Sequence, residues 1–322
     1  MKLLVAYDGS KCAEAALDDL VRAGLPESGE AVVISVAEVW LPPPESMADT
    51  NGNGTGVKLD AEWENIIEKR YEKDKRAVFE AETLAKHARQ RIQRILPRWQ
   101  IGAAATYGSP AWEILARSDE FKPDLIVVGS NGRSAVSRFF LGSISQKVLT
   151  EARCSVRVAR GRIEVDPSPL RVIIGFDGSK GARAAIAAFR ERCWPAESEI
   201  RLVAATEEVT PSAIGRFIPP VTHMIEEINE TEREWMEKLA ENDVASLQSD
   251  KARCGLNIHA GNPKEVLVEE AERWNADCIF LGANAFGSKV ERFLLGSTSA
   301  AVAARAHCSV EVVRKTVDAL AG

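Results

Sequence analysis

The sequence lacks any apolar run of the roughly 18 residues that a membrane-spanning helix needs. Its opening segment, 1–8, reaches an acidic side chain before the apolar core of a signal peptide can form. It also lacks an excess of positive charge, because 47 acidic residues against 41 basic ones give a net charge of −6. A basic field for nucleic acid or anionic lipid is therefore excluded. We expect a soluble, cytoplasmic protein whose partners are neither nucleic acid nor membrane.

The chain has few side chains arranged as metal or disulfide sites are. Its six cysteines contain no Cys-x-x-Cys pair, and its four histidines show no ligand spacing. We interpret the cysteines as reduced, mostly buried thiols. The seven tryptophans do not alternate with basic residues, so we predict that they are packing anchors and not a stacking platform for bases.

What the sequence does contain is an internal repeat. The segment LVAYDGSK at 4–11 returns as IIGFDGSK at 173–180, and CSVRV at 154–158 returns as CSVEV at 308–312. With 322 residues, about twice the usual length of one domain, the chain is predicted to hold two copies of one unit. We place the two domains at 1–160 and 171–316.

Two segments stand outside the repeat. A linker is predicted at 161–170, which contains two prolines in a short polar stretch. The first copy has surplus residues, and we assign them to an insertion at 42–60, whose Pro-Pro-Pro and alternating glycines resist regular structure.

Each copy alternates short apolar runs with helical periodicity. In the first copy the predicted strands are 2–7, 31–37, 101–107, 125–128 and 156–159. The predicted helices are one capped by Ser10 and running to Val21, then 60–96, 110–118 and 143–151. Strands separated by helices favour right-handed crossovers and a parallel sheet covered on both faces. The fold class is therefore α/β, with two tandem five-stranded parallel sheets of order 3-2-1-4-5.

Two glycine-containing turns fall where such a sheet binds ligands. Ligands lie beyond the carboxyl ends of the strands, where strand order reverses, and here that is between the first and fourth strands. Gly129 and Gly132 permit close backbone approach, and Gly142-Ser143 opens a helix whose N-terminal amides favour an anion. The set predicts a phosphate cradle. For any one of these residues the alternative is a turn glycine or a capping serine.

Three charged residues near this cradle each have two interpretations. Asp8 ends the first strand, so it either contacts a base, a ribose or a cation, or only closes a turn. Arg133 and Arg138 lie between Gly132 and Gly142 and are either phosphate neighbours or solvated loop arginines.

The spacing Gly129-x-x-Gly132, nine residues, Gly142-Ser143 resembles the ATP-binding signature of the universal stress protein family. The opening strand that ends in Asp8-Gly9-Ser10 fits the same family, and the resemblance covers nearly the whole chain. It implies a tandem universal stress protein of two Rossmann-like domains, similar to adenine nucleotide alpha hydrolases. It also implies ATP, or ADP or AMP, with Mg²⁺ or Mn²⁺ held through the phosphates, and a nucleotide-dependent role in stress response or signalling. The nucleotide-binding residues implied are Asp8, Val36, Ala37, Gly129, Ser130, Asn131, Gly132, Arg133, Gly142, Ser143, Ile144 and Ser145.

The second copy departs from this signature. Alanine at 285 replaces the second glycine, and ten residues instead of nine precede Gly296-Ser297. An alanine still offers an amide but narrows the permitted backbone conformations. We therefore rank occupancy of the first site above the second. The second, weaker site consists of Asp177, Gly282, Asn284, Gly287, Gly296, Ser297, Thr298 and Ser299.

The sequence favours binding over rapid catalysis. No Walker lysine follows a glycine loop, and His259, which ends a strand of the second copy, is interpreted as a satisfied or solvated histidine. Slow ATP hydrolysis or autophosphorylation stays open. An enzyme of the adenine-nucleotide hydrolase kind is disfavoured because no SGGxDS-like loop follows the first strand. A nucleotide-independent scaffold that uses 42–60 as an interaction loop is the second hypothesis, with an unknown protein partner in either case.

The last strands of the two copies predict how the copies meet. In Val156-Arg157-Val158 and Val310-Glu311-Val312, an arginine and a glutamate occupy equivalent positions. In the family that the chain resembles, such strands pair antiparallel across a dimer. We expect them to join the two copies within one chain, which hides both edges. A homodimer also remains open, as does an accidental charge match.

Overall fold

The computed structural model describes residues 1–39, 61–130, 141–160, 169–207, 209, 219–248, 252–283 and 295–314. The insertion predicted at 42–60 and most of the predicted linker lie outside these residues.

The first half alternates strands and helices as the repeat predicts. Its strands are β1 (Lys2–Ala6), β2 (Glu30–Ala37), β3 (Gln100–Tyr107), β4 (Leu125–Gly129) and β5 (Ser155–Ala159). Its helices are α1 (Lys11–Asp19), the short 3-10 helix η1 (Leu20–Arg22), α2 (Ala61–Ile95), α3 (Pro110–Phe121) and α4 (Ser143–Glu151).

The second half repeats the order. Its strands are β6 (Arg171–Gly175), β7 (Ser198–Thr206), β8 (Ala252–Ala260), β9 (Cys278–Gly282) and β10 (Ser309–Val313). Its helices are α5 (Lys180–Arg190), α6 (Pro219–Leu247), α7 (Pro263–Trp274) and α8 (Ser297–Arg305). None of the helices among the described residues combines the length and apolar character that a membrane span needs.

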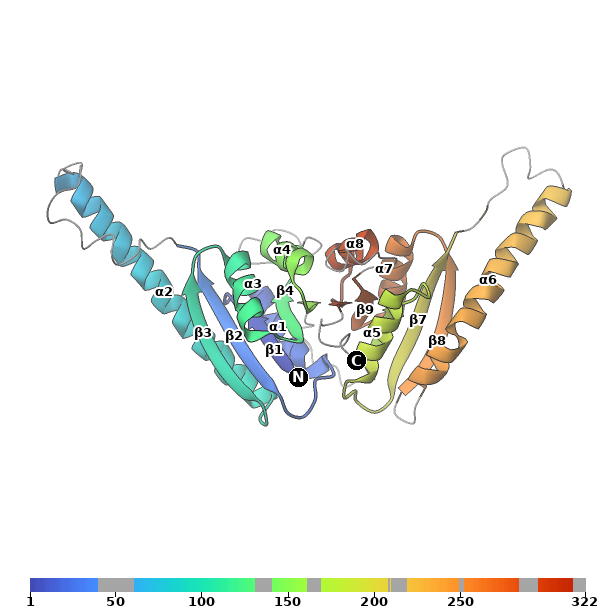
Figure 1. Cartoon of the computed structure of the whole chain (residues 1–322), viewed down its shortest axis with the longest axis horizontal. Coiled ribbons are helices and arrows are strands. Elements are labelled where there is room, and N and C mark those ends of the chain that lie inside the picture. Colours follow the sequence, from blue (N-terminus) through green and yellow to red (C-terminus); the bar gives the residue numbers. More distant parts are fainter. Residues whose placement is uncertain are drawn as a thin grey trace.

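The strands form one ten-stranded sheet of order β3-β2-β1-β4-β5-β10-β9-β6-β7-β8 (Figure 1). Within each half the neighbours are parallel, and the second half mirrors the order of the first. The predicted fold class, two doubly wound halves of strand order 3-2-1-4-5, is confirmed. The strand-order reversal in each half lies at the β1–β4 pair and at the β6–β9 pair.

Helices cover both faces of the sheet. Helices α1 and α2 pack on one face of the first half, and α5 and α6 cover the same face of the second half. Each of these helix pairs packs over its own apolar cluster. A third apolar cluster, on the opposite face, contains residues of α3, α4, α7 and α8 from both halves. One apolar core therefore crosses the boundary between the copies, which burial of apolar area stabilises as it would a single domain.

The two halves meet through β5 and β10, which pair antiparallel as the sequence predicts. Arg157 lies directly opposite Glu311 in this ladder, and both side chains are fully buried. Their neighbours Val156, Val158 and Val312 face the shared apolar core. The pattern follows from the period of two along a strand, which puts the valines on one face and the charged pair on the other.

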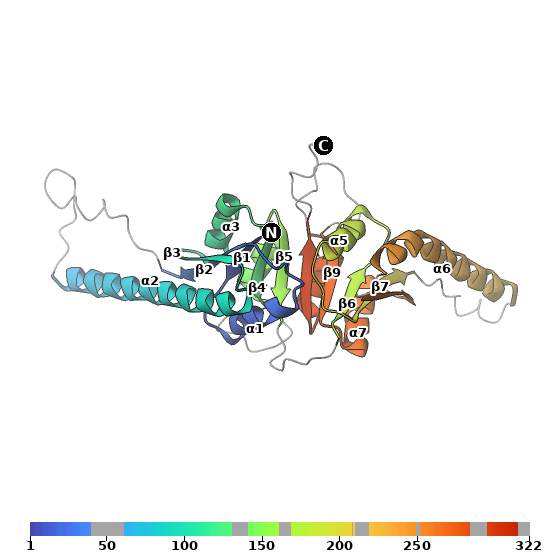
Figure 2. The same ribbon diagram turned by 90° about the horizontal axis from the view of Figure 1, so that it is seen from below.

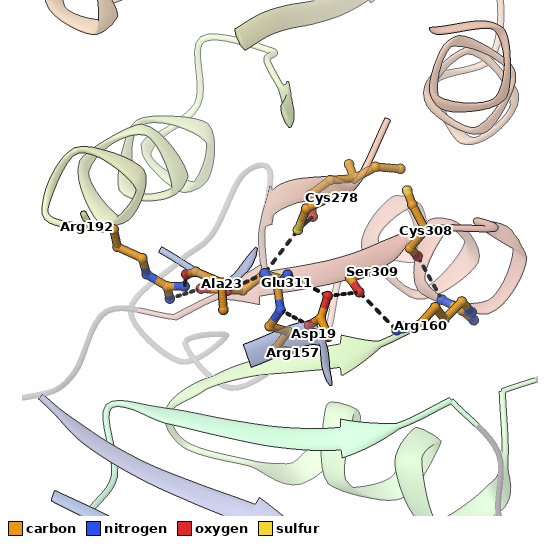
Figure 3. A network of polar contacts seen from close by, with 10 residues as sticks. Asp19, Ala23, Arg157, Arg160, Arg192, Cys278, Cys308, Ser309 and Glu311 are labelled. Carbon is orange, nitrogen blue, oxygen red and sulfur yellow. Dashed lines mark hydrogen bonds and ion pairs between the residues drawn. The ribbon is translucent and has the colours of Figure 1, made fainter. Parts of the chain in front are cut away.

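The charged pair belongs to a buried network (Figure 3). Arg157 Nε lies 2.5 Å from Asp19 Oδ2, and its Nη1 lies 3.3 Å from Glu311 Oε2. Arg192 contacts the other carboxylate oxygen of Glu311, and Ser309 Oγ donates to Asp19 Oδ1 over 2.7 Å. Burial by itself lowers the pKa of Arg157, but the carboxylates of Asp19 and Glu311 outweigh it and hold that pKa well above its usual range.

Two arginines reach across the joint to the last helix of the other half. Arg160, just after β5, donates to Ala303 O in α8 over 2.6 Å. Arg314, just after β10, donates to Leu149 O in α4 over 2.6 Å. Each arginine thus caps the carboxyl end of the opposite helix, where unpaired carbonyls and the helix dipole favour a cation. The joint therefore anchors α4 and α8 as well as the sheet.

Candidate nucleotide site

The end of β1 is built as a tight turn into α1. Gly9 adopts a φ of 75°, which glycine tolerates without strain. The Ser10 amide donates to Asp8 Oδ1 over 2.9 Å, and Ser10 Oγ accepts from the Ala13 amide over 3.1 Å. Ser10 is therefore the N-cap of α1. The Asp8 carboxylate closes the turn, so one of its two predicted roles is present in the structure.

The first turn of α4 lies beside the end of β4. Gly142 is the N-cap residue, in extended conformation, and it brings no capping side chain. Its amide donates to Ser130 O over 2.8 Å, and Ser145 Oγ donates to Gly129 O over 2.6 Å. Ser143 and Ile144 are exposed. A helix start without a capping side chain leaves amides directed at an incoming anion.

Gly129 is glycine because β4 presses against the start of α1. A Cβ at this position would lie 2.9 Å from the Cys12 carbonyl carbon and oxygen and 3.1 Å from the Ala13 amide nitrogen. Those are backbone atoms that cannot move aside. The close approach sets the end of β4 next to the turn at Asp8.

The end of β2 lies next to the end of β1. Ser35 Oγ donates to Tyr7 O over 2.6 Å, and the Tyr7 amide donates to Ile34 O over 2.9 Å. Ala37 is buried and Val36 half-buried. The structure thus places the predicted residues of β1, β2, β4 and α4 at one edge of the sheet, whereas Asn131, Gly132, Arg133 and Arg138 lie outside the described residues.

We call the residues Asp8, Gly129, Ser130, Gly142 and Ser145 the first cradle frame. The second cradle frame consists of their counterparts Asp177, Gly282, Ala283, Gly296 and Ser299.

The second cradle frame repeats the first closely. The Ser179 amide donates to Asp177 Oδ1 over 2.9 Å, and Ser299 Oγ donates to Gly282 O over 2.7 Å. Gly296 is the N-cap of α8, and its amide donates to Ala283 O over 2.6 Å. Ser297 is exposed and Thr298 half-buried. Asn284 and Gly287 lie outside the described residues. The frames alone therefore do not rank one site above the other.

A pocket of about 420 Å³ opens at the outer edge of the second half, and the sequence did not predict it. Its lining residues come from the ends of β7 and β8 and from α6. They are Thr206, Glu207, Asn229, Glu230, Glu232, Arg233, Ile258 and Ala260. Thr206 is the counterpart of Ala37, because each carbonyl accepts from the amide of the glycine after the third strand of its half. Because Ala37 was predicted as a site residue, its counterpart Thr206 could have indicated this pocket from the sequence.

The two halves carry different charged groups beside their frames. In the first, Arg91 of α2 contacts both Glu14 and Asp18 of α1, and the Tyr7 hydroxyl donates to Glu14. Burial raises the pKa of Tyr7 and of Asp18. In the second half a phenylalanine stands at the tyrosine position and Arg183 at the Glu14 position, 3.6 Å from Asp243. The helix after the first strand therefore contributes the acidic partner of the ion pair in the first half and the basic partner in the second.

His259 lies away from the cradle, on the face of β8 that α7 covers. Its Nε2 is 3.5 Å from Glu270 Oε2. Glu270 is buried and also binds Arg201, Asn257 and Arg273, at 2.8, 3.0 and 2.7 Å. The His259 Nε2 makes no hydrogen bond among the described residues, and the imidazole lies at the edge of the Glu270 cluster.

A divalent cation has no ready-made protein ligand set among the described residues. No group of three or more histidine, cysteine, aspartate or glutamate side chains in that part of the chain is placed to hold one.

The fold and the two frames define the class: a duplicated, doubly wound α/β protein whose copies share one sheet and one core. A family model described as the universal stress protein family matches residues 1–160 and 170–314. The chain belongs to the universal stress protein family and carries its domain twice.

The chain is similar to one curated relative and to two solved structures. A universal stress protein of Mycobacterium tuberculosis is 26% identical over 197 residues, which cover 60% of this chain and 62% of that protein. The chain thus spans about three fifths of the length of that curated relative. The crystal structure of a universal stress protein from Archaeoglobus fulgidus is similar in fold, with a TM-score of 0.56 at 22% identity over 98% of this chain and 97% of its own. A universal stress protein family protein from Arabidopsis thaliana, solved with AMP bound, is 20% identical, covers 47% of this chain and 94% of its own, and has a TM-score of 0.33.

Proposed function

We propose that the first half binds ATP, with Mg²⁺ or Mn²⁺ held through its phosphates, and that occupancy of this site governs the protein's role in a stress response. The observation that carries the proposal is the start of α4. A helix without a capping side chain begins within hydrogen-bonding distance of the β4 end, at the strand-order reversal. The phosphates would lie against the amides of this first turn, between Gly129 and Gly142.

The rest of the nucleotide has room at the same edge. The adenosine would lie against Val36 and Ala37, next to the Asp8 turn, which Ser35 ties to β2. The other predicted contacts, Asn131, Gly132 and Arg133, would come from the segment between β4 and α4. When bound, the cation would neutralise phosphate charge.

Binding is proposed as the main activity, and slow hydrolysis as a secondary one. Rapid hydrolysis needs a base placed on the attacking water. His259 lies beside Glu270 and is not part of the first cradle frame, so we do not assign it that task. A nucleotide-independent scaffold is the alternative, and the pocket at the ends of β7 and β8 is compatible with either function.

The test is a nucleotide assay of purified full-length chain, followed by calorimetric titration with ATP and Mg²⁺. Gly142→Val and Gly296→Val form a matched pair, since each adds the same side chain to the same helix cap. We expect Gly142→Val to weaken ATP binding at least about tenfold, a loss of roughly 1.4 kcal/mol, and Gly296→Val to keep most of it. Circular dichroism checks that both variants stay folded.

Two outcomes contradict the proposal. If the chain releases no nucleotide and ATP with Mg²⁺ does not raise its melting temperature, the scaffold function takes precedence, because a ligand at 100 times its Kd stabilises by about 2.7 kcal/mol. If Gly296→Val removes binding and Gly142→Val does not, the second half is the binding half.

A further inference from the structure

Helix α6 carries an exposed apolar stripe on the side that does not face the sheet, as far as the described residues show. Met224, Ile228 and Trp235 are 54%, 45% and 57% exposed. Their spacing of four and seven residues places them on one side of the helix, whereas Met236, Ala240 and Leu247 face the sheet. The prediction that the tryptophans are packing anchors is therefore wrong for Trp235, and also for Trp112, which is 56% exposed. Large apolar side chains that gather in one exposed stripe mark an interaction surface.

The stripe has an acidic border. Glu227, Glu234 and Glu241 follow it along one side at seven-residue spacing, so they line the same edge of the stripe. Over its whole length α6 carries eight carboxylates and two basic side chains, Arg233 and Lys238. Its partner should therefore bring positive charge together with apolar surface.

Helix α2 has that chemistry. Lys69, Lys73 and Arg76, spaced by four and three residues, share one side of the helix and are exposed. Among the described residues none of the three has an ion-pair partner, whereas Arg70 and Lys75 do. Phe79, one turn after Arg76, is 69% exposed. The long stems of lysine and arginine cover apolar surface while their charged ends reach acidic groups beside it.

The two helices cannot meet within one molecule. They lie at opposite ends of the ten-stranded sheet, and their N-terminal parts project beyond it on the outer flanks (Figures 1 and 2). A contact between them requires two molecules.

We propose that the stripe Met224, Ile228 and Trp235 of α6 docks onto the basic side of α2 in a second copy of this chain. The stems of Lys69, Lys73 and Arg76 lie across Ile228 and the Trp235 ring, where a cation over the indole adds a further attraction. Their charged ends pair with the glutamate border. One helix pair is smaller than a standard stable interface, so the association is weak and weakens further with salt. Because the two surfaces differ, the contact is heterologous: it either closes into a ring or continues from molecule to molecule.

Sedimentation velocity of the full chain tests this, over a concentration series at about 0.05 M and about 0.5 M salt, since screening shortens the reach of the charges. We expect species heavier than the 35.1 kDa monomer at low salt, and their loss at high salt. The α6 variant Ile228→Ser/Trp235→Ser and the α2 variant Lys73→Glu/Arg76→Glu should each weaken self-association at least about tenfold, as truncation of interface anchors does. All four positions are exposed, so circular dichroism should report both variants folded.

The decisive measurement mixes the two variants in equal amounts. The α6 variant still has an intact α2 and the α2 variant an intact α6, so the mixture should form a heterodimer that neither makes alone. The proposal is overturned if the unaltered chain stays monomeric at low salt, if either variant associates as the unaltered chain does, or if the mixture stays monomeric. Association that only the α6 variant removes would indicate α6 pairing with α6, and would overturn it as well.

Discussion

The two halves of this protein keep the same cradle frame in different surroundings. The serine that closes each frame donates to the end of its fourth strand over 2.6 Å in the first half and 2.7 Å in the second. The caps of α4 and α8 share nearly the same backbone angles. Beside them, the ion pair between helices is reversed, because α2 supplies the arginine in the first half and α5 supplies it in the second. The second half also carries the buried Glu270 cluster. Duplication has preserved what the backbone path demands and has allowed the helix surfaces to diverge.

The joint is where the copies have to differ. Positions 157 and 311 are equivalent in the repeat and lie directly opposite each other between β5 and β10. In a symmetric pair of identical copies this position would face itself, with like charges opposed and destabilising. Within one chain an arginine faces a glutamate instead. Because the two copies are parts of one chain and differ in sequence, the two equivalent positions can carry opposite charges.

The largest expected effect comes from removing one partner at that joint. Arg157→Met leaves Asp19 and Glu311 buried with less compensation, so we expect the free energy of unfolding to fall by about 3–5 kcal/mol. Urea unfolding monitored by circular dichroism measures it. Arg153→Met is the control, because Arg153 is exposed and lies 3.6 Å from Asp119, a pair worth at most about 1 kcal/mol. Equal losses for the two variants would mean that the buried network does not hold the halves together.

The next effect compares the two frames directly. A Cβ at Gly282 would lie 2.5 Å from Gly181 O, and one at Gly129 would lie 2.9 Å from Cys12 O. Both neighbours are backbone, so each alanine variant must displace a helix start and should cost about 1–3 kcal/mol. We expect Gly282→Ala to be the costlier of the two.

Thermal unfolding of both variants measures this difference. Gly102→Ala serves as the control, because the nearest atom to its Cβ would be 3.6 Å away, and we expect a change within about 0.5 kcal/mol. If Gly129→Ala were costlier than Gly282→Ala, the two strand ends would not be packed as the structure describes.

The sequence predicted the fold and most of the frames because both depend on local patterns. Strand runs, helix caps and the spacing of Gly129 and Gly142 are written in adjacent residues, and the offsets of the repeat cross-check each assignment. Arg157 and Glu311 were also identified, since they occupy equivalent positions. Their partners Asp19 and Arg192 were not, because each comes from a helix end that only the assembled sheet brings near.

The pocket at the ends of β7 and β8 was not predicted, for a related reason. Its lining residues from α6 are separated in sequence from those of β7 and β8. The exposure of Trp235 was also predicted wrongly. Its side chain is large and apolar like that of a core residue, but it lies on the side of α6 that faces away from the sheet. Helix α6 has two apolar sides, and only one of them packs on the sheet. Helical periodicity alone does not show which side is buried.

The effect that is smallest at neutral pH, and that appears only as the pH rises, concerns the thiols that precede the last strand of each half. Cys154 lies 3.9 Å from Ser118 Oγ, whereas the position equivalent to Ser118 in the second half is an alanine. Burial raises the pKa of Cys154 to about 11, against about 8.5 for an unfolded thiol. Between these values the unfolded chain releases the proton and the folded chain keeps it. The unfolded state then binds fewer protons, so this thiol lowers stability as pH rises from about 8.5 to about 11 and contributes no slope below that range.

Replacing Cys154 should therefore flatten part of that slope. We expect Cys154→Ala to lose less free energy of unfolding between pH 8.5 and 11 than the unaltered chain, whatever its stability at pH 7, because the readout is the difference between two pH values. Urea unfolding across this pH range measures it. Cys193→Ala is the matched control, since the Cys193 thiol is exposed and its removal should leave the slope unchanged. Identical slopes for Cys154→Ala and Cys193→Ala would show that the Cys154 thiol ionises as readily in the folded protein as in the unfolded chain, and that the packing around Ser118 does not set it apart from an exposed cysteine.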